Sequence, residues 1–238
     1  MVGSTFDEWV AQRYEQLWPE LFDPAVLGPA VDFLAELAAG GSALELGIGT
    51  GRVALPLSRR GVAVHGIDLT AAMVARVRDD AVGVTVGDFA HTSLGRTFRL
   101  VYLLRNTITN LTTQDDQVDC FRNAAAHLEP GGLFVIENYI PALQRLPPGE
   151  TVRVFTQTPT HLGFEEYDLA AQLAVSHHRW TIDGQHYMFS STHRYLWPGE
   201  LDLMAKIAGL TLRERWGDWH RSPFTDDSQS HISVWARP

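Results

Sequence analysis

The chain has 238 residues, of which 45% are hydrophobic, a composition typical of a globular α/β protein and not of a disordered one. Lys and Arg total 19 against 28 Asp and Glu, a formal net charge of −9, and no basic patch or stripe suited to duplex nucleic acid is visible. No apolar run approaches the roughly 20 residues that a membrane-spanning helix needs. We therefore expect neither a nucleic-acid nor a membrane partner.

The N-terminal residues and the cysteine content bear on the compartment. The N-terminus, MVGSTFDEWVAQRYEQ, is acidic and amphipathic, without the basic region and apolar run of a signal peptide. Cys120 is the only cysteine, which excludes an internal disulfide and a cysteine metal cluster. We expect a cytoplasmic protein without a bound metal ion.

Helical spacing alternates with short apolar runs from residue 29 to residue 138. The predicted helices are 29–38, 52–59, one that Thr70 caps and one that begins at a Thr113–Asp116 capping box. The predicted strands are 43–46, 62–68, 84–89, 99–104 and 133–138, the last after a stop at EPGG (129–132). Alternation at this pace predicts βαβ units and a parallel sheet.

The pattern changes after residue 150. Residues 151–197 are strand-like with little helical spacing, and Asp183-Gly184 among them is a hairpin signal. We interpret this stretch as a small antiparallel sheet inserted after the fifth strand. Pro198 then opens a helix that Gly209 ends, and LTLRERW and HISVWAR are predicted to be the last two strands.

The stretch LELGIGTGR (44–52) has three glycines in five positions directly after an apolar run, which indicates close approach of a ligand to the backbone. A P-loop needs a Lys after its glycines, and none follows here. Gly49 to Ala54 fits the dinucleotide pattern G-x-G-x-x-[GA], with Asp68 at about the distance of a ribose carboxylate. S-adenosylmethionine (SAM), a nucleoside cofactor without pyrophosphate, would need the same close approach and the same carboxylate.

Residues around the glycines favour SAM over a dinucleotide. Gly49 comes two residues late for a dinucleotide site, and Arg52 takes the third glycine's place when counting starts at Gly47. Glu45 is placed to order the loop and meet the cofactor's ammonium group. Asp88 is placed to accept a hydrogen bond from an adenine amino group.

Together these segments resemble the class I SAM-dependent methyltransferases of the seven-stranded kind. The resemblance is carried by E-L-G-I-G-T-G (45–51), G-I-D-L-T-x-x-M (66–73), G-D-F (87–89) and E-P-G-G-x-F-V-I-E (129–137). It covers about residues 30–140, the final helix and the last two strands. It implies an α/β fold with a Rossmann-like, mostly parallel seven-stranded sheet, helices on both faces and a small antiparallel β insertion after strand five.

The resemblance also implies a division of the chain and a cofactor site. The division is an N-terminal helical cover (1–40), a SAM-binding core (41–150), an inserted lid (151–197) and a C-terminal helix with two strands (198–238). The three glycines would line the methionine moiety, Asp68 would hold the ribose hydroxyls, Met73 and Phe89 would flank the adenine, and Asp88 would bond its amino group. Plain core packing is the alternative for Met73 and Phe89. The expected cofactor-binding residues are Tyr14, Glu45, Gly47, Gly49, Gly51, Asp68, Leu69, Met73, Asp88, Phe89 and Arg105.

The acceptor site should gather the segment after the fourth strand, the N-terminal helices and the inserted sheet. LRNTITN lacks the [DNS]-P-P-[YF] motif found in DNA amino-methyltransferases, and no paired-glutamate loop like that of protein arginine methyltransferases occurs. A small-molecule acceptor remains. The expected acceptor-binding residues are Trp18, Asn106, Asn110, His161 and Tyr195.

Candidate general bases lie in the inserted sheet, where alternation puts His178 with Ser176 and Trp180. The expected catalytic residues are His178, His193 and Glu166. The alternative for each is a hydrogen-bonded residue of the sheet or of a dimer interface. Tyr14 and Trp18 offer aromatic faces for a sulfonium, or hold down the N-terminal segment. Arg105 meets an acceptor carboxylate or pairs with a surface acid, and Asn106 and Asn110 suit a turn without any further role.

We expect a SAM-dependent methyltransferase of secondary metabolism. Its acceptor would be a small, partly aromatic or amine-bearing metabolite, with N- or C-methylation favoured over O-methylation. Deoxysugar N-methyltransferases and glycine-N-methyltransferase-like enzymes resemble this layout, in which the inserted sheet is a lid and a potential homodimer contact. One alternative is an NAD(P) oxidoreductase, although the chain has no Tyr-x-x-x-Lys. The other is a non-catalytic SAM-binding protein.

Overall fold

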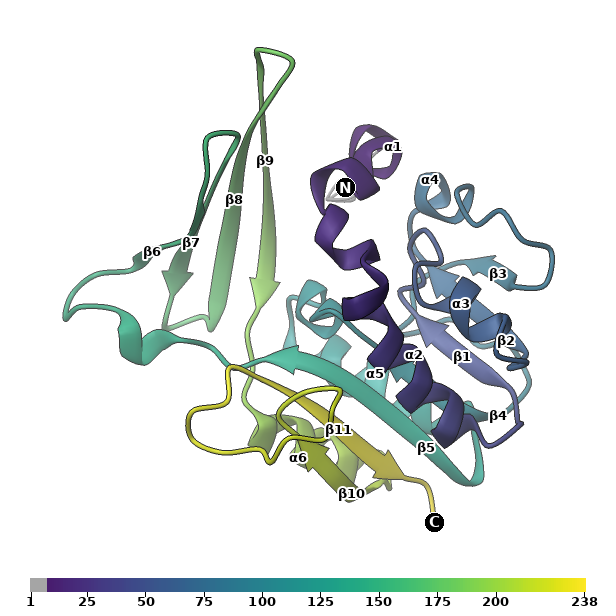
Figure 1. Cartoon of the computed structure of the whole chain (residues 1–238). Helices are drawn as coiled ribbons and strands as arrows, with labels where there is room; N and C mark the ends of the chain where they lie inside the picture. Colours follow the sequence, from purple (N-terminus) through teal and green to yellow (C-terminus); the bar gives the residue numbers. More distant parts are fainter. Residues whose placement is uncertain (1–7) are drawn as a thin grey trace.

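The computed structural model describes residues 8–238, which contain two β-sheets (Figure 1). The strands of the larger sheet are β1 (Ala43–Leu46), β2 (Val64–Asp68), β3 (Gly83–Val86), β4 (Phe98–Leu103), β5 (Leu128–Tyr139), β10 (Thr211–Trp216) and β11 (Ser230–Ala236). They lie in the order β10-β11-β5-β4-β1-β2-β3. Strand β11 is antiparallel to β5 and β10, and the other paired strands are parallel. This mostly parallel seven-stranded sheet confirms the predicted fold class.

Helices cover both faces of the larger sheet. The helices of the described chain are α1 (Glu8–Leu17), α2 (Pro24–Ala38), α3 (Ala54–Ser58), α4 (Ala71–Val74), α5 (Gln114–Ala126) and α6 (Pro198–Ile207), with the 3₁₀ turns η1 (Pro19–Phe22), η2 (Thr107–Asn110) and η3 (Leu143–Arg145). One buried cluster joins α5 and α6 to one face, where Phe121 packs edge-on against Phe134 and Trp235. A second cluster joins α2 and α3 to the other face around Leu34 and Leu57. The core therefore has two apolar layers, one on each side of the sheet.

Several predicted boundaries shift by a few residues, and two of the differences have a clear physical reason. Helix α2 begins at Pro24 and not at residue 29, because Asp23 caps it by accepting a hydrogen bond from the Ala25 N–H at 2.9 Å. The EPGG segment lies within β5 as a bulge, where the register with β4 shifts between Phe98 and Leu100. Hydrogen bonds with Arg237 at both Gly131 and Gly132 hold this bulge, so its shape depends on the end of the chain.

The smaller sheet is antiparallel throughout, as predicted. Its strands, in spatial order, are β6 (Val152–Gln157), β7 (His161–Asp168), β8 (Leu173–Ile182) and β9 (Gln185–Arg194). Asp183 and Gly184 have φ values of 50° and 74°, the left-handed conformations of a two-residue hairpin turn. The buried Arg194 at the end of β9 bonds Gln117 of α5 and Glu200 of α6, and so fastens the smaller sheet to the core.

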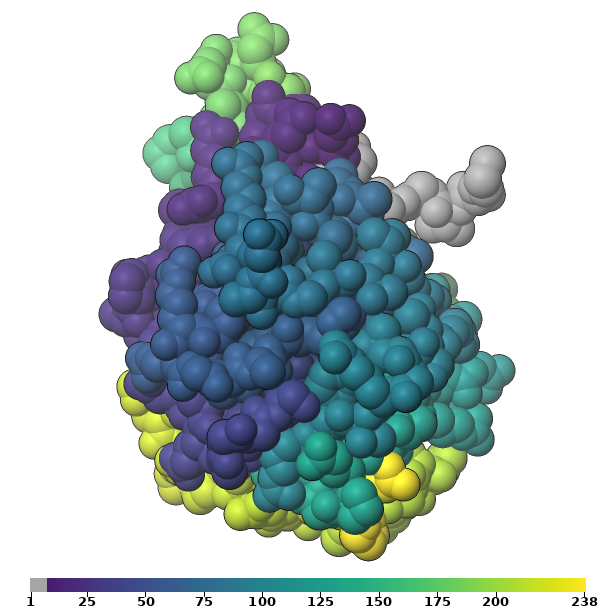
Figure 2. Space-filling model, turned by 90° about the vertical axis from the view of Figure 1, so that its right-hand side faces the viewer, coloured from purple at the N-terminus to yellow at the C-terminus, as the bar shows by residue number. Residues whose placement is uncertain are grey.

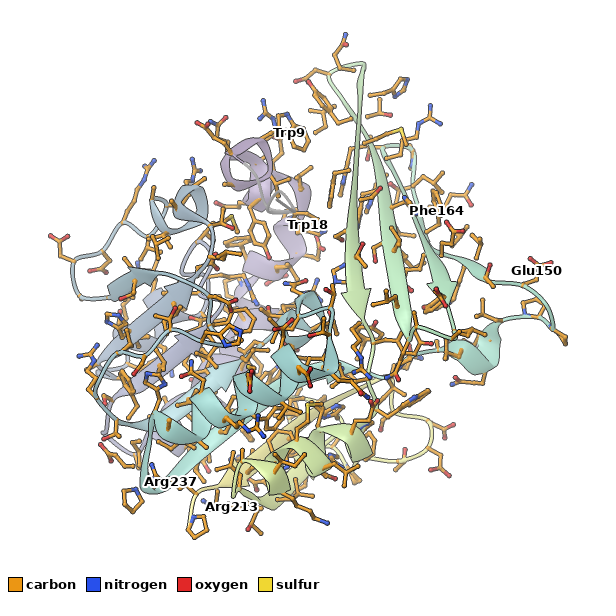
Figure 3. All side chains as sticks on the ribbon, turned by 180° about the vertical axis from the view of Figure 1, so that it is seen from behind. Trp9, Trp18, Glu150, Phe164, Arg213 and Arg237 are labelled. Carbon is orange, nitrogen blue, oxygen red and sulfur yellow. The ribbon has the colours of Figure 1, made fainter. Side chains whose placement is uncertain are left out.

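The N-terminal segment bridges the two sheets (Figures 2 and 3). Trp9 packs at a tilt against Tyr187 near the tip of the β8–β9 hairpin, with ring centroids 4.7 Å apart. Trp18 meets the rings of His178, Trp180 and Phe189 edge-on at 6.0–6.1 Å. In the expected cover of residues 1–40, residues 1–7 lie outside the described part. Within residues 8–238 no helix is long and apolar enough to span a bilayer.

Candidate active site

A cavity of about 1290 Å³ lies between the carboxyl ends of the parallel strands, the N-terminal segment and the smaller sheet. Its volume exceeds the about 300–1,000 Å³ usual for one small ligand, so it has room for a cofactor and an acceptor together. Most of the residues predicted for cofactor binding, acceptor binding or catalysis line it: Tyr14, Trp18, Gly47, Gly49, Asp68, Leu69, Met73, Asp88, Phe89, Arg105, Asn106, Asn110, His161, His178 and His193.

The glycine loop after β1 forms a bare-backbone cradle at one end of the cavity. Gly47, Gly49 and Gly51 have φ values of 73°, 56° and 79°, where other residues are strained. A Cβ at Gly47 would lie 2.6 Å from the Thr107 Cγ2 atom, too close for any side chain without movement. The loop therefore needs glycine both for its conformation and for its neighbours.

Asp68 at the end of β2 fixes the glycine loop. Its Oδ2 accepts a hydrogen bond from the Gly49 N–H and its Oδ1 accepts one from the Thr70 N–H, both at 2.8 Å. Thr70 occupies the N-cap position of α4 as predicted, but its side chain makes no capping hydrogen bond to the helix, and Asp68 organises that turn. Burial raises the pKa of Asp68. The carboxylate keeps lone pairs for hydroxyl groups of a ligand.

Glu45, in β1, and Gly51, in the glycine loop, do not line the cavity. Glu45 is buried, and its Oε2 accepts a hydrogen bond from the Tyr102 hydroxyl at 3.0 Å. Burial raises the pKa of Glu45 to about 8. A Cβ at Gly51 would meet Leu55 and Val77 at 3.2–3.3 Å. Glu45 is thus placed to order the loop from below, and its expected contact with an ammonium group stays a prediction.

Met73 and Phe89 combine the two roles considered for them. They are 5% and 8% exposed, and both line the cavity next to the glycines. A Cβ at Gly49 would lie 3.4 Å from the Met73 Cε atom. Asp88 lines the same end, where its Oδ1 accepts the Ala90 N–H at 2.8 Å. We call this end, between Met73 and Phe89, the slot; its apolar side chains lie near the Asp88 carboxylate, a combination that suits an adenine ring.

The turn after β4 has an uncommon backbone. Arg105 and Asn106 are consecutive non-glycine residues in the left-handed region, with φ values of 54° and 62°. Glu137 accepts the Arg105 N–H at 2.9 Å, and the Asn106 Oδ1 accepts the Tyr139 N–H at 2.8 Å. The side chain of Asn106 therefore fastens the turn to β5, while Thr109 in η2 faces the smaller sheet.

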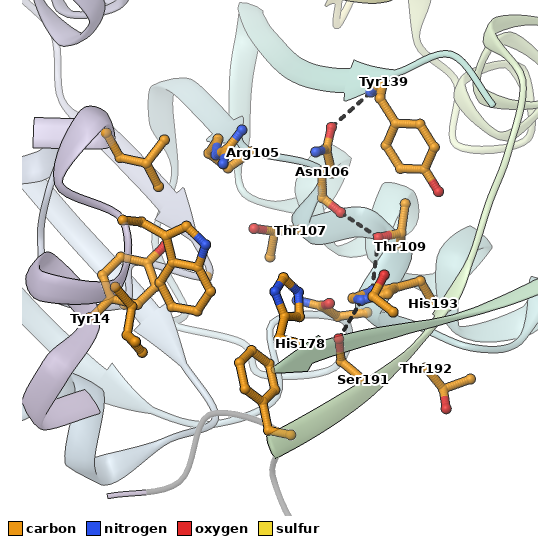
Figure 4. A pocket seen from close by; sticks show the side chains of 18 of the residues that line it. Tyr14, Arg105, Asn106, Thr107, Thr109, Tyr139, His178, Ser191, Thr192 and His193 are labelled. Atoms are coloured by element: carbon orange, nitrogen blue, oxygen red, sulfur yellow. Dashed lines mark hydrogen bonds between the residues drawn. The ribbon is translucent and has the colours of Figure 1, made fainter. Parts of the chain in front are cut away.

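Histidines line the facing wall of the smaller sheet (Figure 4). The His178 ring stacks on Phe189 with centroids 4.6 Å apart, and its Nδ1 lies 2.9 Å from the His161 Nε2. The His193 Nε2 lies 2.7 Å from the Ser191 Oγ, and its Nδ1 lies 3.4 Å from the Thr109 Oγ1. Burial lowers the pKa of both His178 and His193 to about 4, helped at His178 by the neighbouring histidines. Both rings are therefore neutral at neutral pH.

Tyr14 and Trp18 form the third wall. Their ring centroids are 5.1 Å apart, and both line the cavity. Burial raises the pKa of Tyr14, whose ring lies near Arg52, Arg105 and Asp68. The pair both faces the cavity and holds the N-terminal segment in place, so the two interpretations of these residues are compatible.

Besides Glu45 and Gly51, two more of the predicted site residues lie outside the cavity. Glu166 is on the opposite face of β7, with a 61% exposed side chain whose Oε2 is 3.8 Å from the His177 Nε2. Tyr195 lies beyond the end of β9, buried against Tyr167. Neither placement supports the expected role in catalysis or acceptor binding.

The structure instead brings Glu165 into the cavity, together with Arg153, Tyr167, Ser176 and Ser191. Sequence reasoning missed Glu165 although the signal was available. Side chains alternate along a strand, so the residue that shares a face with His161 is Glu165 and not Glu166.

Comparisons with known proteins agree with this geometry. Residues 43–132 match the family model of a methyltransferase domain. The chain is 39% identical to the CcbJ methyltransferase from Streptomyces caelestis, whose structure superposes with a TM-score of 0.80 over 88% of this chain and 89% of that one. It is 26% identical to a cypemycin N-terminal methyltransferase from a Streptomyces species, over 98% of both chains. The SAM-bound structure of CalS10, an amino pentose methyltransferase from Micromonospora echinaspora, shares the fold at 22% identity, with a TM-score of 0.68 and 89% and 91% coverage of the two chains.

The class of protein follows from the fold, from the glycine cradle with Asp68, and from these relatives. The chain belongs to the class I SAM-dependent methyltransferases. Its cofactor is SAM, and the bare-backbone loop, Asp68 and the slot beside Met73 fit that cofactor. An NAD(P) oxidoreductase is thereby set aside.

Proposed function

We propose that this methyltransferase transfers a methyl group to a nitrogen of a small-molecule amine bound between the glycine loop and the smaller sheet. When bound, SAM supplies a methyl group on a positively charged sulfur. The glycine loop and Asp68 would hold it at one end of the cavity. Tyr14 and Trp18 would offer aromatic faces to the cation.

The observation that carries the choice of nitrogen is the state of the two histidines. An amine attacks with its own lone pair, whereas a hydroxyl or a carbon acid needs a base to take its proton. The conjugate acids of His178 and His193 have pKa values of about 4, so both rings are weak bases at neutral pH. Among these acceptors, a neutral amine depends least on the histidines as bases, because it needs no proton removed before it attacks.

The histidines then act by binding and not by taking a proton. Each neutral ring donates at one nitrogen and accepts at the other. His193 is engaged at both nitrogens, with Ser191 and Thr109, and would position the Ser191 hydroxyl toward the acceptor. Alignment of this kind supplies much of the acceleration in reactions between two held partners. The name of the cypemycin N-terminal methyltransferase, which spans the same length, also supports nitrogen as the target.

Matched acceptor pairs test the proposal. Release of S-adenosylhomocysteine from SAM is measured with amines and with their hydroxyl counterparts, such as benzylamine with benzyl alcohol and piperidine with cyclohexanol. We expect release above background with amines alone, rising as pH increases the neutral amine fraction. Release with the alcohols and not with the amines would overturn the choice of nitrogen.

We also propose, as predicted from the sequence, that the smaller sheet contributes to a homodimer. Its outer face exposes Val152, Val154 and Met188 at 48%, 53% and 73%. Sedimentation velocity of the wild type and of Val154→Glu tests this. We expect a dimer that the substitution dissociates, and a wild-type monomer at micromolar concentration would contradict the proposal.

A further inference from the structure

A polar cluster occupies the part of the cavity wall formed by β6 and β7. Arg153 and Glu165 are directly opposite each other in the antiparallel register. The Tyr167 hydroxyl donates a hydrogen bond to the Glu165 Oε2 and lies close enough to the Arg153 side chain to interact with it. All three side chains line the cavity.

Among residues 8–238, most of the hydrogen-bonding capacity of Arg153 and Glu165 is unused. A carboxylate has about four lone-pair sites and a guanidinium five N–H donors. The Glu165 Oε1 also accepts a hydrogen bond from the Ser176 Oγ at 3.4 Å. In the described part of the chain, no ion pair joins Arg153 to Glu165. The wall therefore presents the Arg153 guanidinium and the Glu165 carboxylate as neighbours that do not pair, with the Tyr167 hydroxyl close to both.

An aromatic surface adjoins this pair. The Phe155 ring lies over Gly163. A Cβ atom at position 163 would be 2.4 Å from this ring, so any residue other than glycine would displace it. The same ring meets His178 edge-on, with centroids 5.4 Å apart, and His178 in turn meets Trp18. A ligand that reaches Glu165 and Arg153 thus has apolar rings beside it.

The cluster lies away from the glycine loop. Glu165, Ser176 and Ser191 face one another across β7, β8 and β9. Neighbouring strands are about 4.8 Å apart, so about 10 Å separates the backbones of Glu165 and Ser191. Ser191 in turn contacts His193, which lies beside the turn after β4. Binding at Glu165 therefore engages a part of the acceptor distinct from the part beside Ser191.

We propose that Glu165 and Arg153 form a bipolar subsite that binds an amino-acid-type group of the acceptor, a group with a positive or N–H-bearing atom next to a carboxylate or carbonyl. The inference rests on the proposed function only in placing the acceptor in this cavity. Glu165 takes the donor side of that group and Arg153 takes its acceptor side. Binding energy at this remote group would align the reacting amine.

Four phenyl-bearing probes test the subsite on protein saturated with S-adenosylhomocysteine, which prevents turnover. They are L-phenylalanine, 2-phenylethylamine, 3-phenylpropanoate and 2-phenylethanol, which carry both charges, one charge or none. Dissociation constants come from ligand-observed NMR titrations. Hydrogen bonds to charged groups are stronger than those between neutral groups, and solvent screens part of the gain, so we expect each charged group to improve binding at least about fivefold over the alcohol.

The variants should dissociate the two preferences. Glu165→Gln should remove the preference for the ammonium and keep that for the carboxylate, and Arg153→Gln should do the reverse. Glu166→Gln and Arg179→Gln change exposed residues on the opposite face of the same sheet and should keep both preferences. An S-adenosylhomocysteine titration of each variant reports whether the cofactor half is intact.

Three results would overturn the subsite: no charge preference in the wild type, an ammonium preference that persists in Glu165→Gln, or loss of both preferences in either variant. Failure here with methylation of amines intact removes the subsite and leaves the proposed function. If the expected charge preferences are found but no amine is methylated, the subsite stands and the proposed function is removed.

Discussion

Replacing Asp68 by Asn should weaken cofactor binding by at least tenfold. The carboxylate holds the Gly49 and Thr70 N–H groups, each at 2.8 Å, and one oxygen of the variant becomes an NH₂ that faces an N–H donor. A hydrogen bond to a charged group contributes about 1.5–3 kcal/mol, and about 1.4 kcal/mol corresponds to a factor of ten. Loss of one such bond therefore predicts a roughly 10- to 150-fold higher dissociation constant, before any lost contact with ribose hydroxyls is added.

Isothermal titration calorimetry with S-adenosylhomocysteine measures this loss. Asp79→Asn is a matched control, because Asp79 also accepts the N–H two residues on, from Ala81 at 3.0 Å, but does not line the cavity. We expect the control to bind like the wild type. An Asp68→Asn protein that keeps its thermal stability and binds within twofold of the wild type would refute the role given to this carboxylate.

Two further changes probe the loop and the acceptor wall. Gly47→Ala should lose both stability and affinity for S-adenosylhomocysteine, because its φ of 73° costs about 1–2 kcal/mol and its Cβ would meet the Thr107 Cγ2 at 2.6 Å. Gly61→Ala is the control for the backbone cost alone, because Gly61 has a φ of 85° and no atom lies within 4 Å of a Cβ there. If both variants lost the same stability in thermal denaturation, the steric contribution at Gly47 would be contradicted. His193→Asn should flatten the pH dependence of stability. The folded-state pKa of about 4 lies below the ordinary 6.5, so the unfolded ring takes up its proton first as pH falls. The wild type should thus lose up to about 3.4 kcal/mol between pH 6.5 and 4, at 1.36 kcal/mol per pKa unit. Urea unfolding at pH 7 and 4.5, with the exposed His186→Asn as control, tests this, and an unchanged pH dependence in His193→Asn would count against it.

Features set by neighbouring residues could be predicted from the sequence. The hairpin at Asp183-Gly184 and the cap of α5, where the Thr113 Oγ1 accepts the Asp116 N–H at 3.1 Å, both follow from local chemistry. The glycine loop and Asp68 lie on adjacent strand ends, so their meeting also follows from the parallel sheet. The fold and the cofactor-binding end of the cavity could therefore largely be predicted from short segments of the sequence.

Features set by distant partners could not be predicted in the same way. The EPGG bulge depends on hydrogen bonds with Arg237 at the other end of the chain. The low pKa of His193 depends on burial by elements that no local pattern specifies. The prediction of Glu166 is a different case. It is wrong although the sequence alone identifies Glu165, because side chains alternate along the strand from His161.

The most direct test of the central claim is calorimetric titration of the wild-type protein with S-adenosylhomocysteine and, separately, with NAD⁺. The glycine cradle, Asp68 and the slot at Met73 predict one S-adenosylhomocysteine site per chain, weakened by Asp68→Asn, and no measurable heat with NAD⁺. Binding of NAD⁺ without binding of S-adenosylhomocysteine would contradict the assignment of this cavity to methyl transfer.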